Sequence, residues 1–401
     1  MQPRVIVVGA AVAGSAVANA LGQLGVPTLV LEKGAERDNS TRGDILHPPT
    51  LAFLEHWGIL DDLHRDGALP MTTIAVSSRE GGRLATFPIE PVGEGPASRS
   101  LAVPHDRIEA VMKAAAERWP SVEIQRANVT GLLRDDDGRV IGVRARTPSG
   151  EREEHATLVV GCDGGNSLVR RQLGIAVDSQ PYDHEYLYIA ADGPTDPPGA
   201  MHFNLDPLGI IMVASRPRQR MRIAIYFPKG ARGDLLRRPD PALYEYVVNR
   251  VPWLVGARIS RERAYIYPIS RQLARSFVAP GAALVGDSAH TTHPAGATGM
   301  NLAISGAARL AEVVAPVLLD GASASNRQRA LDDVLEAYDA ERRPAAAAAL
   351  ERNHRQAMRI WQDGVQHDPD AYVRAVDPNA DWGVGGAGWG KNPAALSESL
   401  A

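Results

Sequence analysis

The amino-acid sequence predicts a mixed α/β protein, and three stretches carry this prediction. Residues 4–32 contain a β-branched run, a glycine turn, an apolar helical pattern and a second apolar run, which is the order of a β–α–β unit. Residues 186–275 contain alternating apolar runs separated by proline, glycine and asparagine, as in an antiparallel sheet. Helical patterns follow between about residues 300 and 361.

Composition excludes several classes of protein. The chain has 401 residues, enough for two or three domains, and its formal net charge of −4 gives no electrostatic basis for binding nucleic acid. Cys162 is the only cysteine, which excludes an internal disulfide and a multi-cysteine metal site. The first apolar run carries Gly9 and Gly14, and no run of about 18 apolar residues occurs. We therefore expect a cytoplasmic protein with no signal peptide and no membrane span.

The N-terminal β–α–β unit has the features of a dinucleotide site. Its turn reads Gly9-Ala-Ala-Val-Ala-Gly14, its helix covers Ser15–Leu24, and its second strand, Pro27–Leu31, ends at Glu32. Such a site needs a tight glycine turn, a helix N-terminus for the pyrophosphate and a carboxylate for a ribose hydroxyl.

A loop with two candidate site residues leads into the next helix. Arg42 and His47 precede Pro48-Pro49 and a helix predicted over Leu51–Leu63. They are either an exposed loop pair or part of a site, and the sequence leaves both interpretations open.

The middle of the chain is predicted to form short strands and one helix. The helix covers residues 107–117 and a hairpin turn covers 135–138. The strands cover residues 73–77, 84–88, 122–124, 129–134, 140–146 and 157–160.

A second strand–loop–helix junction follows the antiparallel region. The strand Ala282–Val285 ends at Gly286-Asp287, and small residues lead to a helix from about Met300 to Leu319. The N–H groups and the positive dipole end at such a helix start suit an anionic or electron-rich ligand. One ligand could occupy both junctions.

The last part of the chain is predicted to be helical and then irregular. Residues 330–361 should form two helices, because Pro344 interrupts the pattern. The glycine-rich tail from Asp377 is expected to be partly disordered.

Four groups of residues occur along the chain in an order typical of one family. They are Gly9, Gly14 and Glu32; Cys162-Asp163-Gly164 with Ser167 and Arg170; Gly286-Asp287 with His290, Pro294, Gly299 and Asn301; and Tyr338 with Arg342-Arg343-Pro344. In this combination the chain resembles the single-component FAD-dependent aromatic hydroxylases, typified by p-hydroxybenzoate hydroxylase. The resemblance implies a Rossmann-like FAD-binding domain of residues 1–75, 101–178 and 272–320, an antiparallel substrate-binding domain of residues 76–100 and 179–271, and C-terminal helices and tail at 321–401.

The resemblance also implies a set of cofactor contacts. Glu32 would bind the adenosine ribose of FAD, Asp287 the ribityl chain, and Asp163 both FAD and NADPH or NADH. The other implied contacts are Gly9, Ala11, Val12, Ala13 and Gly14 at the pyrophosphate, Gly299, Met300 and Asn301 at the pyrimidine edge of the flavin, and Lys33, Arg42, Arg107, Val129, Gly286 and Pro294. No metal is expected.

Four positions depart from the family pattern. Ala11 and Ala297 replace frequent glycines, Gly306 stands where aspartate is usual, and His105 stands where arginine is common. These departures weaken individual cofactor contacts and leave the resemblance intact.

The implied activity is a monooxygenase that uses FAD, NAD(P)H and O2 to hydroxylate an electron-rich aromatic, phenolic or quinonoid small molecule through a flavin hydroperoxide. The cofactor carries the chemistry, and the protein binds, orients and excludes water. His47 is the candidate base for a phenol proton and Arg42 the candidate orienting residue. A monomer or homodimer is expected.

Two other functions stay open. A flavin reductase or dehydrogenase of the same fold would not add an oxygen atom to its product. A flavoprotein that binds its ligand without turnover would not oxidise NAD(P)H.

Overall fold

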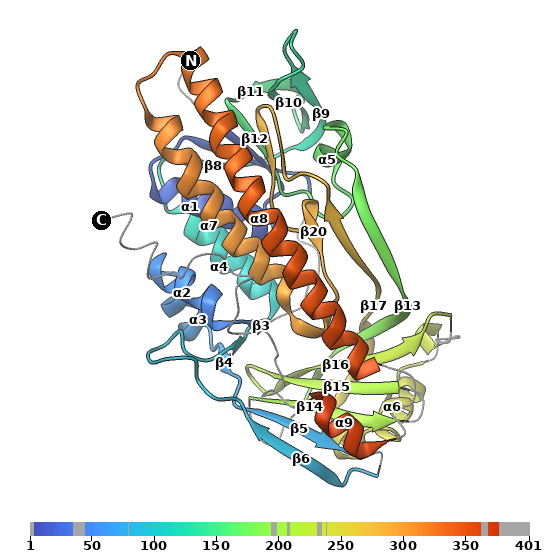
Figure 1. Cartoon of the computed structure of the whole chain (residues 1–401). Helices are drawn as coiled ribbons and strands as arrows, with labels where there is room; N and C mark the ends of the chain where they lie inside the picture. Colours follow the sequence, from blue (N-terminus) through green and yellow to red (C-terminus); the bar gives the residue numbers. More distant parts are fainter. Residues whose placement is uncertain are drawn as a thin grey trace.

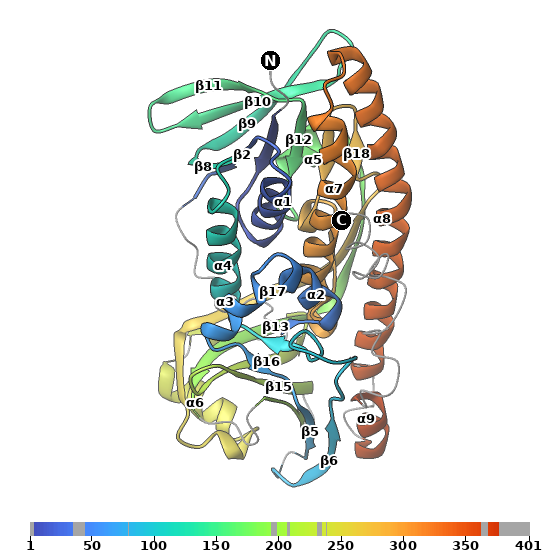
Figure 2. The same ribbon diagram turned by 90° about the vertical axis from the view of Figure 1, so that its left-hand side faces the viewer.

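Two sheets and one long helix organise the molecule, described here from a computed structural model. The eight-stranded sheet lies at one end, the six-stranded sheet at the other, and α8 (Ala324–Trp361) runs beside both (Figures 1 and 2). Arg42 and the tail from Asp377 lie outside the described residues. The structure describes residues 4–34, 45–78, 80–193, 199–206, 209–230, 235–237, 239–361 and 368–376.

The six-stranded sheet is built around the N-terminal strand. All four residues of β1 are buried, as expected for a parallel strand covered on both faces. Only the edge pair β18·β19 is antiparallel. The strand order is β18 (Val278–Ala279), β19 (Ala282–Leu284), β12 (Leu158–Gly161), β1 (Val5–Val8), β2 (Thr28–Glu32) and β8 (Val122–Arg126).

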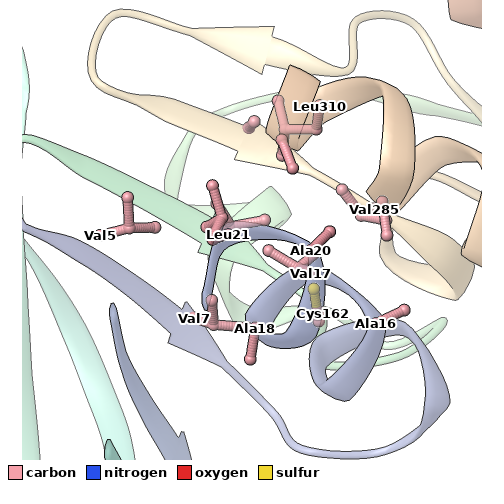
Figure 3. Close-up of a cluster of buried hydrophobic side chains, with 14 of the residues drawn as sticks. Val5, Val7, Ala16, Val17, Ala18, Ala20, Leu21, Cys162, Val285 and Leu310 are labelled. Atoms are coloured by element: carbon pink, nitrogen blue, oxygen red, sulfur yellow. The ribbon is translucent and has the colours of Figure 1, made fainter. Parts of the chain in front are cut away.

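Three helices pack beside this sheet. The first, α1 (Val12–Gln23), lies between α4 (His105–Glu117) and α7 (Thr298–Leu319) (Figure 2). Val17 and Leu21 of α1 share one buried apolar cluster with Cys162, Val285 and Leu310 (Figure 3). The predicted β–α–β unit is therefore confirmed.

α7 also has the composition of a membrane helix. It is the one helix in the described part of the chain that is long and apolar enough to span a membrane, and 61% of its apolar window is buried inside the protein. Such burial is typical of the core helix of a globular fold.

Smaller elements connect the two large sheets. Residues 51–63 do not form the single helix that was predicted: the chain turns at Gly58, where φ is 67°. This left-handed conformation ends the helix, so two short helices form, α2 (Pro48–His56) and α3 (Leu60–Arg65).

The other connecting elements are two small sheets and a short helix. One sheet contains β9 (Asn128–Arg134), β10 (Val140–Thr147) and β11 (Gly150–His155), the other contains β3 (Ile45–Leu46), β7 (Leu101–Ala102) and β4 (Leu69–Pro70), and the helix is α5 (Leu168–Gln172).

The eight-stranded sheet contains the predicted antiparallel region. Its pairs are antiparallel except β5·β14, because the excursion that forms β5 and β6 joins the edge of the sheet in parallel. The strand order is β20 (His290–Thr291), β17 (Arg258–Ala274), β13 (Val177–Asp192), β16 (Arg220–Pro228), β15 (Gly209–Arg216), β14 (Ala200–Asp206), β5 (Thr73–Ser77) and β6 (Arg83–Pro88).

The two faces of this sheet belong to different apolar clusters. We call the face that carries Tyr182, Tyr186 and Tyr188 the inner face; its cluster also includes Ile45 and, at its margin, Ala297. The outer face packs against α6 (Asp240–Val248) and the turn η2 (Pro252–Leu254). The inner face therefore adjoins the junction before α7. The domain boundaries given above stay a prediction.

The C-terminal region differs from the prediction at Pro344. The chain forms one helix, α8, with Pro344 inside it, rather than two helices. Leu335, Tyr338, Ala346 and Ala349 are buried on both sides of the proline. Packing along the neighbouring helix keeps α8 continuous although the proline removes one backbone hydrogen bond. A short helix, α9 (Pro369–Val376), follows.

Candidate cofactor site

The two strand–loop–helix junctions meet in space. Gly286 follows β19 with φ of 72°, and a Cβ built on it would lie 2.7 Å from Ala13 Cβ of α1 and 3.3 Å from Ala303 Cβ of α7. Only a glycine fits this conformation at this distance. Both helix starts therefore lie around one place, as a ligand shared by the two junctions requires.

The first junction depends on two glycines. Gly9 has φ of 99°, and a Cβ on it would lie 2.6 Å from the Cys162 carbonyl oxygen. A Cβ on Gly14 would lie 1.8 Å from the Gly9 carbonyl oxygen. The helix can approach the turn this closely only without side chains at these positions. Ala11, which replaces a glycine frequent in the family pattern, is exposed.

Glu32 lies against the glycine turn. Its Oε2 accepts a hydrogen bond from the Ala10 N–H at 2.7 Å, and its Oε1 accepts one from the Gly34 N–H at 3.0 Å. The carboxylate at the end of β2 therefore stabilises the turn, and its contact with a ribose hydroxyl stays a prediction. Lys33 is exposed beside it.

Asp163 shapes the loop after β12. Its carboxylate accepts hydrogen bonds from the Ser167 hydroxyl at 2.5 Å and from the N–H groups of Leu168 and Val169 at 2.6 and 3.1 Å. It thus caps the start of α5. This structural role was not expected from the sequence, and the predicted cofactor contact of Asp163 stays a prediction.

Arg170 ties this loop to the second junction. Its guanidinium donates to the Gly165 carbonyl at 2.6 Å and to the Ser288 carbonyl at 2.7 Å. Asp287 stands beside Ser288 in the turn η3 (Gly286–Ser288) and is half-buried. Arg170 therefore helps to fix the segment that holds Asp287.

Asn301 connects the start of α7 to the chain before α2. Its Nδ2 donates to the carbonyls of Ile45 at 2.9 Å and Ala297 at 2.7 Å, and its Oδ1 accepts from the His47 N–H at 2.9 Å. The side chain is fully buried. Asn301 thus joins the two loops that the resemblance assigns to the flavin. The neighbouring predicted residues, Pro294 in η4 (Pro294–Gly296) and Gly299 and Met300 in the first turn of α7, lie in the same segment.

The imidazole of His47 is held by two protein groups. Its Nε2 lies 2.9 Å from the Gly296 carbonyl oxygen and its Nδ1 lies 3.2 Å from Ser100 Oγ. Because a carbonyl can only accept, Nε2 carries the proton and Nδ1 accepts from the Ser100 hydroxyl. Burial lowers the pKa of His47, so the ring is neutral near pH 7.

Two predicted contacts lie in the region of α4 and β9. Arg107 makes two hydrogen bonds of 2.6 Å to Asp66, and this pairing lowers the pKa of Asp66. Val129 is buried in β9 opposite Ala145. Arg107 therefore has a carboxylate partner in the protein, a role that the sequence did not reveal.

A buried histidine pair beside the second junction was missed by the sequence interpretation. His293 Nδ1 accepts from the Ala295 N–H at 3.1 Å, so the ring proton is on Nε2, which lies 2.8 Å from His184 Nε2. Burial lowers the pKa of His184 to about 4, and burial together with the neighbouring His184 holds the pKa of His293 well below its ordinary value. The pair joins the inner face to the loop before α7. Its members are 109 residues apart, and no local pattern connects them.

Acidification is expected to destabilise the protein through its buried histidines. The folded-state pKa values of His184 and His290 are about 4, below the ordinary value of 6.5. Between pH 6.5 and 4 the unfolded chain therefore binds more protons. The contribution of these histidines to the free energy of unfolding should be constant above about pH 7 and fall below it by up to ~1.4 kcal/mol per pH unit for each histidine.

Urea unfolding of the protein and of His184→Gln at pH 8, 6 and 5 measures this effect. The variant should lose less stability between pH 8 and 5 than the parent does. Equal losses in both proteins would show that His184 titrates normally.

Comparisons with known proteins identify what the chain resembles. The sequence model of the family described as "FAD binding domain" matches residues 2–353. A 3-(3-hydroxy-phenyl)propionate/3-hydroxycinnamic acid hydroxylase of Escherichia coli is 27% identical over 355 residues, which cover 87% of this chain and 60% of the relative. Squalene epoxidase 1 of Arabidopsis thaliana is 26% identical over 362 residues, which cover 86% of this chain and 64% of the relative. The chain thus spans about 60% of the length of these relatives.

Solved structures share the fold. PqsL from Pseudomonas aeruginosa, a probable FAD-dependent monooxygenase, has a TM-score of 0.77 at 23% identity, covering 94% of this chain and 99% of PqsL. The p-nitrophenol 4-monooxygenase PnpA from Pseudomonas putida has a TM-score of 0.78 at 22% identity, covering 100% of this chain and 96% of PnpA.

Proposed function

Because this chain belongs to the FAD-binding-domain family, whose cofactor is FAD, we propose that it is a monooxygenase. It uses NADPH or NADH and O2 to hydroxylate an electron-rich aromatic, phenolic or quinonoid small molecule. The observation that carries the proposal is the close approach of Gly286 to Ala13, which brings both junctions around one place next to the inner face.

The proposed cofactor contacts follow the two junctions. The turn Gly9–Gly14 and the start of α1 would hold the pyrophosphate, Glu32 would hold the adenosine ribose, and Asp287 would hold the ribityl chain. The start of α7 would face the pyrimidine edge of the flavin, where its positive dipole end would stabilise negative charge on the reduced ring. FAD supplies the redox and oxygen-transfer chemistry when bound.

The inner face is the proposed substrate side. Tyr186 and Tyr188 stack at 5.5 Å between ring centroids, and Tyr226 lies 6.4 Å from Tyr186 in an edge-on arrangement. Their cluster reaches Ile45, two residues before His47, and Ala297, at the start of α7. Aromatic rings next to the proposed flavin position suit a planar aromatic substrate.

Substrate-stimulated NAD(P)H oxidation tests the proposal. The FAD-loaded protein is screened with phenols, quinones and polycyclic aromatics under isotopically labelled O2. A substrate should accelerate NAD(P)H oxidation and leave with one labelled oxygen atom. Product without labelled oxygen would indicate a reductase or dehydrogenase, and the absence of NAD(P)H oxidation with every compound would indicate binding without turnover.

The setting of the enzyme is also part of the proposal. It acts in the cytoplasm as a monomer or homodimer, on a small molecule and without nucleic acid. Among the relatives one is named a hydroxylase and another an epoxidase, so the screen should include compounds with an isolated double bond.

A further inference from the structure

The loop that precedes α7 is held from the C-terminal helix by one side chain. Nδ2 of Asn353 in α8 lies 2.7 Å from Thr292 Oγ1, 3.0 Å from Thr298 Oγ1 and within hydrogen-bond distance of the His293 carbonyl oxygen, and its two hydrogens are shared among these three acceptors. Asn353 is 2% exposed. A single amide thus bridges both ends of the loop 292–298, from 55 to 61 residues away in the sequence.

The chemistry of these partners fixes the direction of the amide. The His293 carbonyl can only accept a hydrogen bond, so the atom that faces it must be the Nδ2 donor. The Oδ1 faces Gly296, where a Cβ would lie 2.6 Å from it. The loop therefore has a glycine at 296 because the amide of Asn353 occupies the space of a side chain.

The loop needs such an anchor because Ala297, the residue before its end, is strained. Ala297 has φ of 50°, a left-handed conformation that costs free energy for any residue with a Cβ. His47 binds the Gly296 carbonyl and Asn301 binds the Ala297 carbonyl from one side. Asn353 holds the loop from α8.

We propose that Asn353 is a positioning residue for FAD, which acts by fixing the loop 292–298 and with it the N-terminus of α7. The inference rests on the proposed placement of the flavin at this helix start. Without the amide, the loop can relax at Ala297 and turn the first N–H groups of α7 away from the pyrimidine edge. Because negative charge on that edge appears on reduction, the reduced cofactor loses more affinity than the oxidised one.

Asn353→Ala, Thr298→Val and the double variant test this inference. Asn353→Ala should bind oxidised FAD about 10- to 100-fold more weakly, the range for losing one or two hydrogen bonds. A further tenfold loss for reduced FAD corresponds to a midpoint potential lower by about 30 mV for a two-electron couple. The double variant should bind FAD no more weakly than Asn353→Ala, since both changes remove the same bond.

Asn204→Ala is the matched control. Asn204 is an equally buried amide in the eight-stranded sheet, bonded to the Ile211 carbonyl and to the Trp253 indole N–H, away from the loop. The Asn204→Ala variant should have a lower melting temperature than the parent and an unchanged midpoint potential of bound FAD. Unchanged FAD affinity and potential in Asn353→Ala, or equal shifts in Asn204→Ala, would overturn the inference. If Asn353→Ala does not fold, Thr298→Val decides: its potential should fall, and a parent-like potential would refute the inference.

These readouts do not depend on catalysis. A parent protein that binds FAD and hydroxylates nothing would refute the proposed activity and leave the role of Asn353 standing. The reverse result, an active enzyme whose FAD ignores Asn353, would refute this inference alone.

Discussion

Replacing His47 by alanine should slow oxygen transfer about 10²- to 10⁴-fold while FAD remains bound, as expected for loss of a general base. Deprotonation of a phenol makes its ring more electron-rich. The lowered pKa keeps His47 neutral at pH 7, in the form that can accept a proton. Its Nε2–H is held by the Gly296 carbonyl, so Nδ1 is the accepting atom.

The hydrogen bond to Ser100 suggests a route for this proton. Ser100 Oγ lies 3.2 Å from Nδ1 and is buried, so a phenol proton could pass through the hydroxyl to the imidazole. We therefore expect Ser100→Ala to slow oxygen transfer in the same direction, by a smaller factor. Arg42, the other proposed catalytic residue, should affect FAD binding or flavin reduction instead.

Single-turnover measurements separate the steps for His47→Ala. FAD affinity is measured in parallel, because His47 also holds the loop before α7. The variant should release more peroxide per NAD(P)H consumed than the parent. If it hydroxylates at the parent rate with unchanged coupling, His47 is only a loop anchor and the proton leaves by another route.

Gly14→Ala should lower the free energy of unfolding by at least ~3 kcal/mol and abolish FAD binding. The added Cβ would lie 1.8 Å from the Gly9 carbonyl oxygen, and this neighbour is backbone, which cannot rotate away. The start of α1 would have to move off the glycine turn, at the cost typical of severe overpacking in a core. The N–H groups of the first turn would then miss the pyrophosphate.

Gly306→Ala is a matched control for this substitution. Gly306 also lies inside a helix, α7, but a Cβ there would meet its nearest neighbour, Tyr338 Oη, at 3.4 Å. Alanine should leave stability unchanged or raise it by up to ~1 kcal/mol through helix propensity. Chemical denaturation and FAD titration of both variants measure the difference. Equal stabilities would mean that the turn and α1 separate without cost.

Several features of the site could be predicted because they are local. The turn Gly9–Gly14, the strand that ends at Glu32 and the helix that follows Gly286 are each signalled by residues within a few positions of one another. The periodicity of apolar residues and the conformational freedom of glycine are properties of a short segment. The first β–α–β unit and α7 therefore appeared as predicted.

Two helix predictions were wrong, each for a different physical reason. Pro344 predicted a break, and burial of residues on both sides of it kept α8 continuous. Gly58 divided a helix that the apolar pattern had predicted to be single. In the first case tertiary contacts exceeded a local penalty, and in the second a backbone conformation ended a favourable pattern.

The sequence by itself thus determined the family, the cofactor and the two helix starts, whose chemistry lies within short segments. Only the tertiary structure decided which side chains hold the loop before α7. They are His47, bonded to Gly296; His184, bonded to His293; and Asn353, bonded to Thr292 and Thr298. These partners are between 55 and 249 residues apart. A hydrogen bond across such a separation depends on which faces of the elements pack together, and no residue pattern along the chain records that choice.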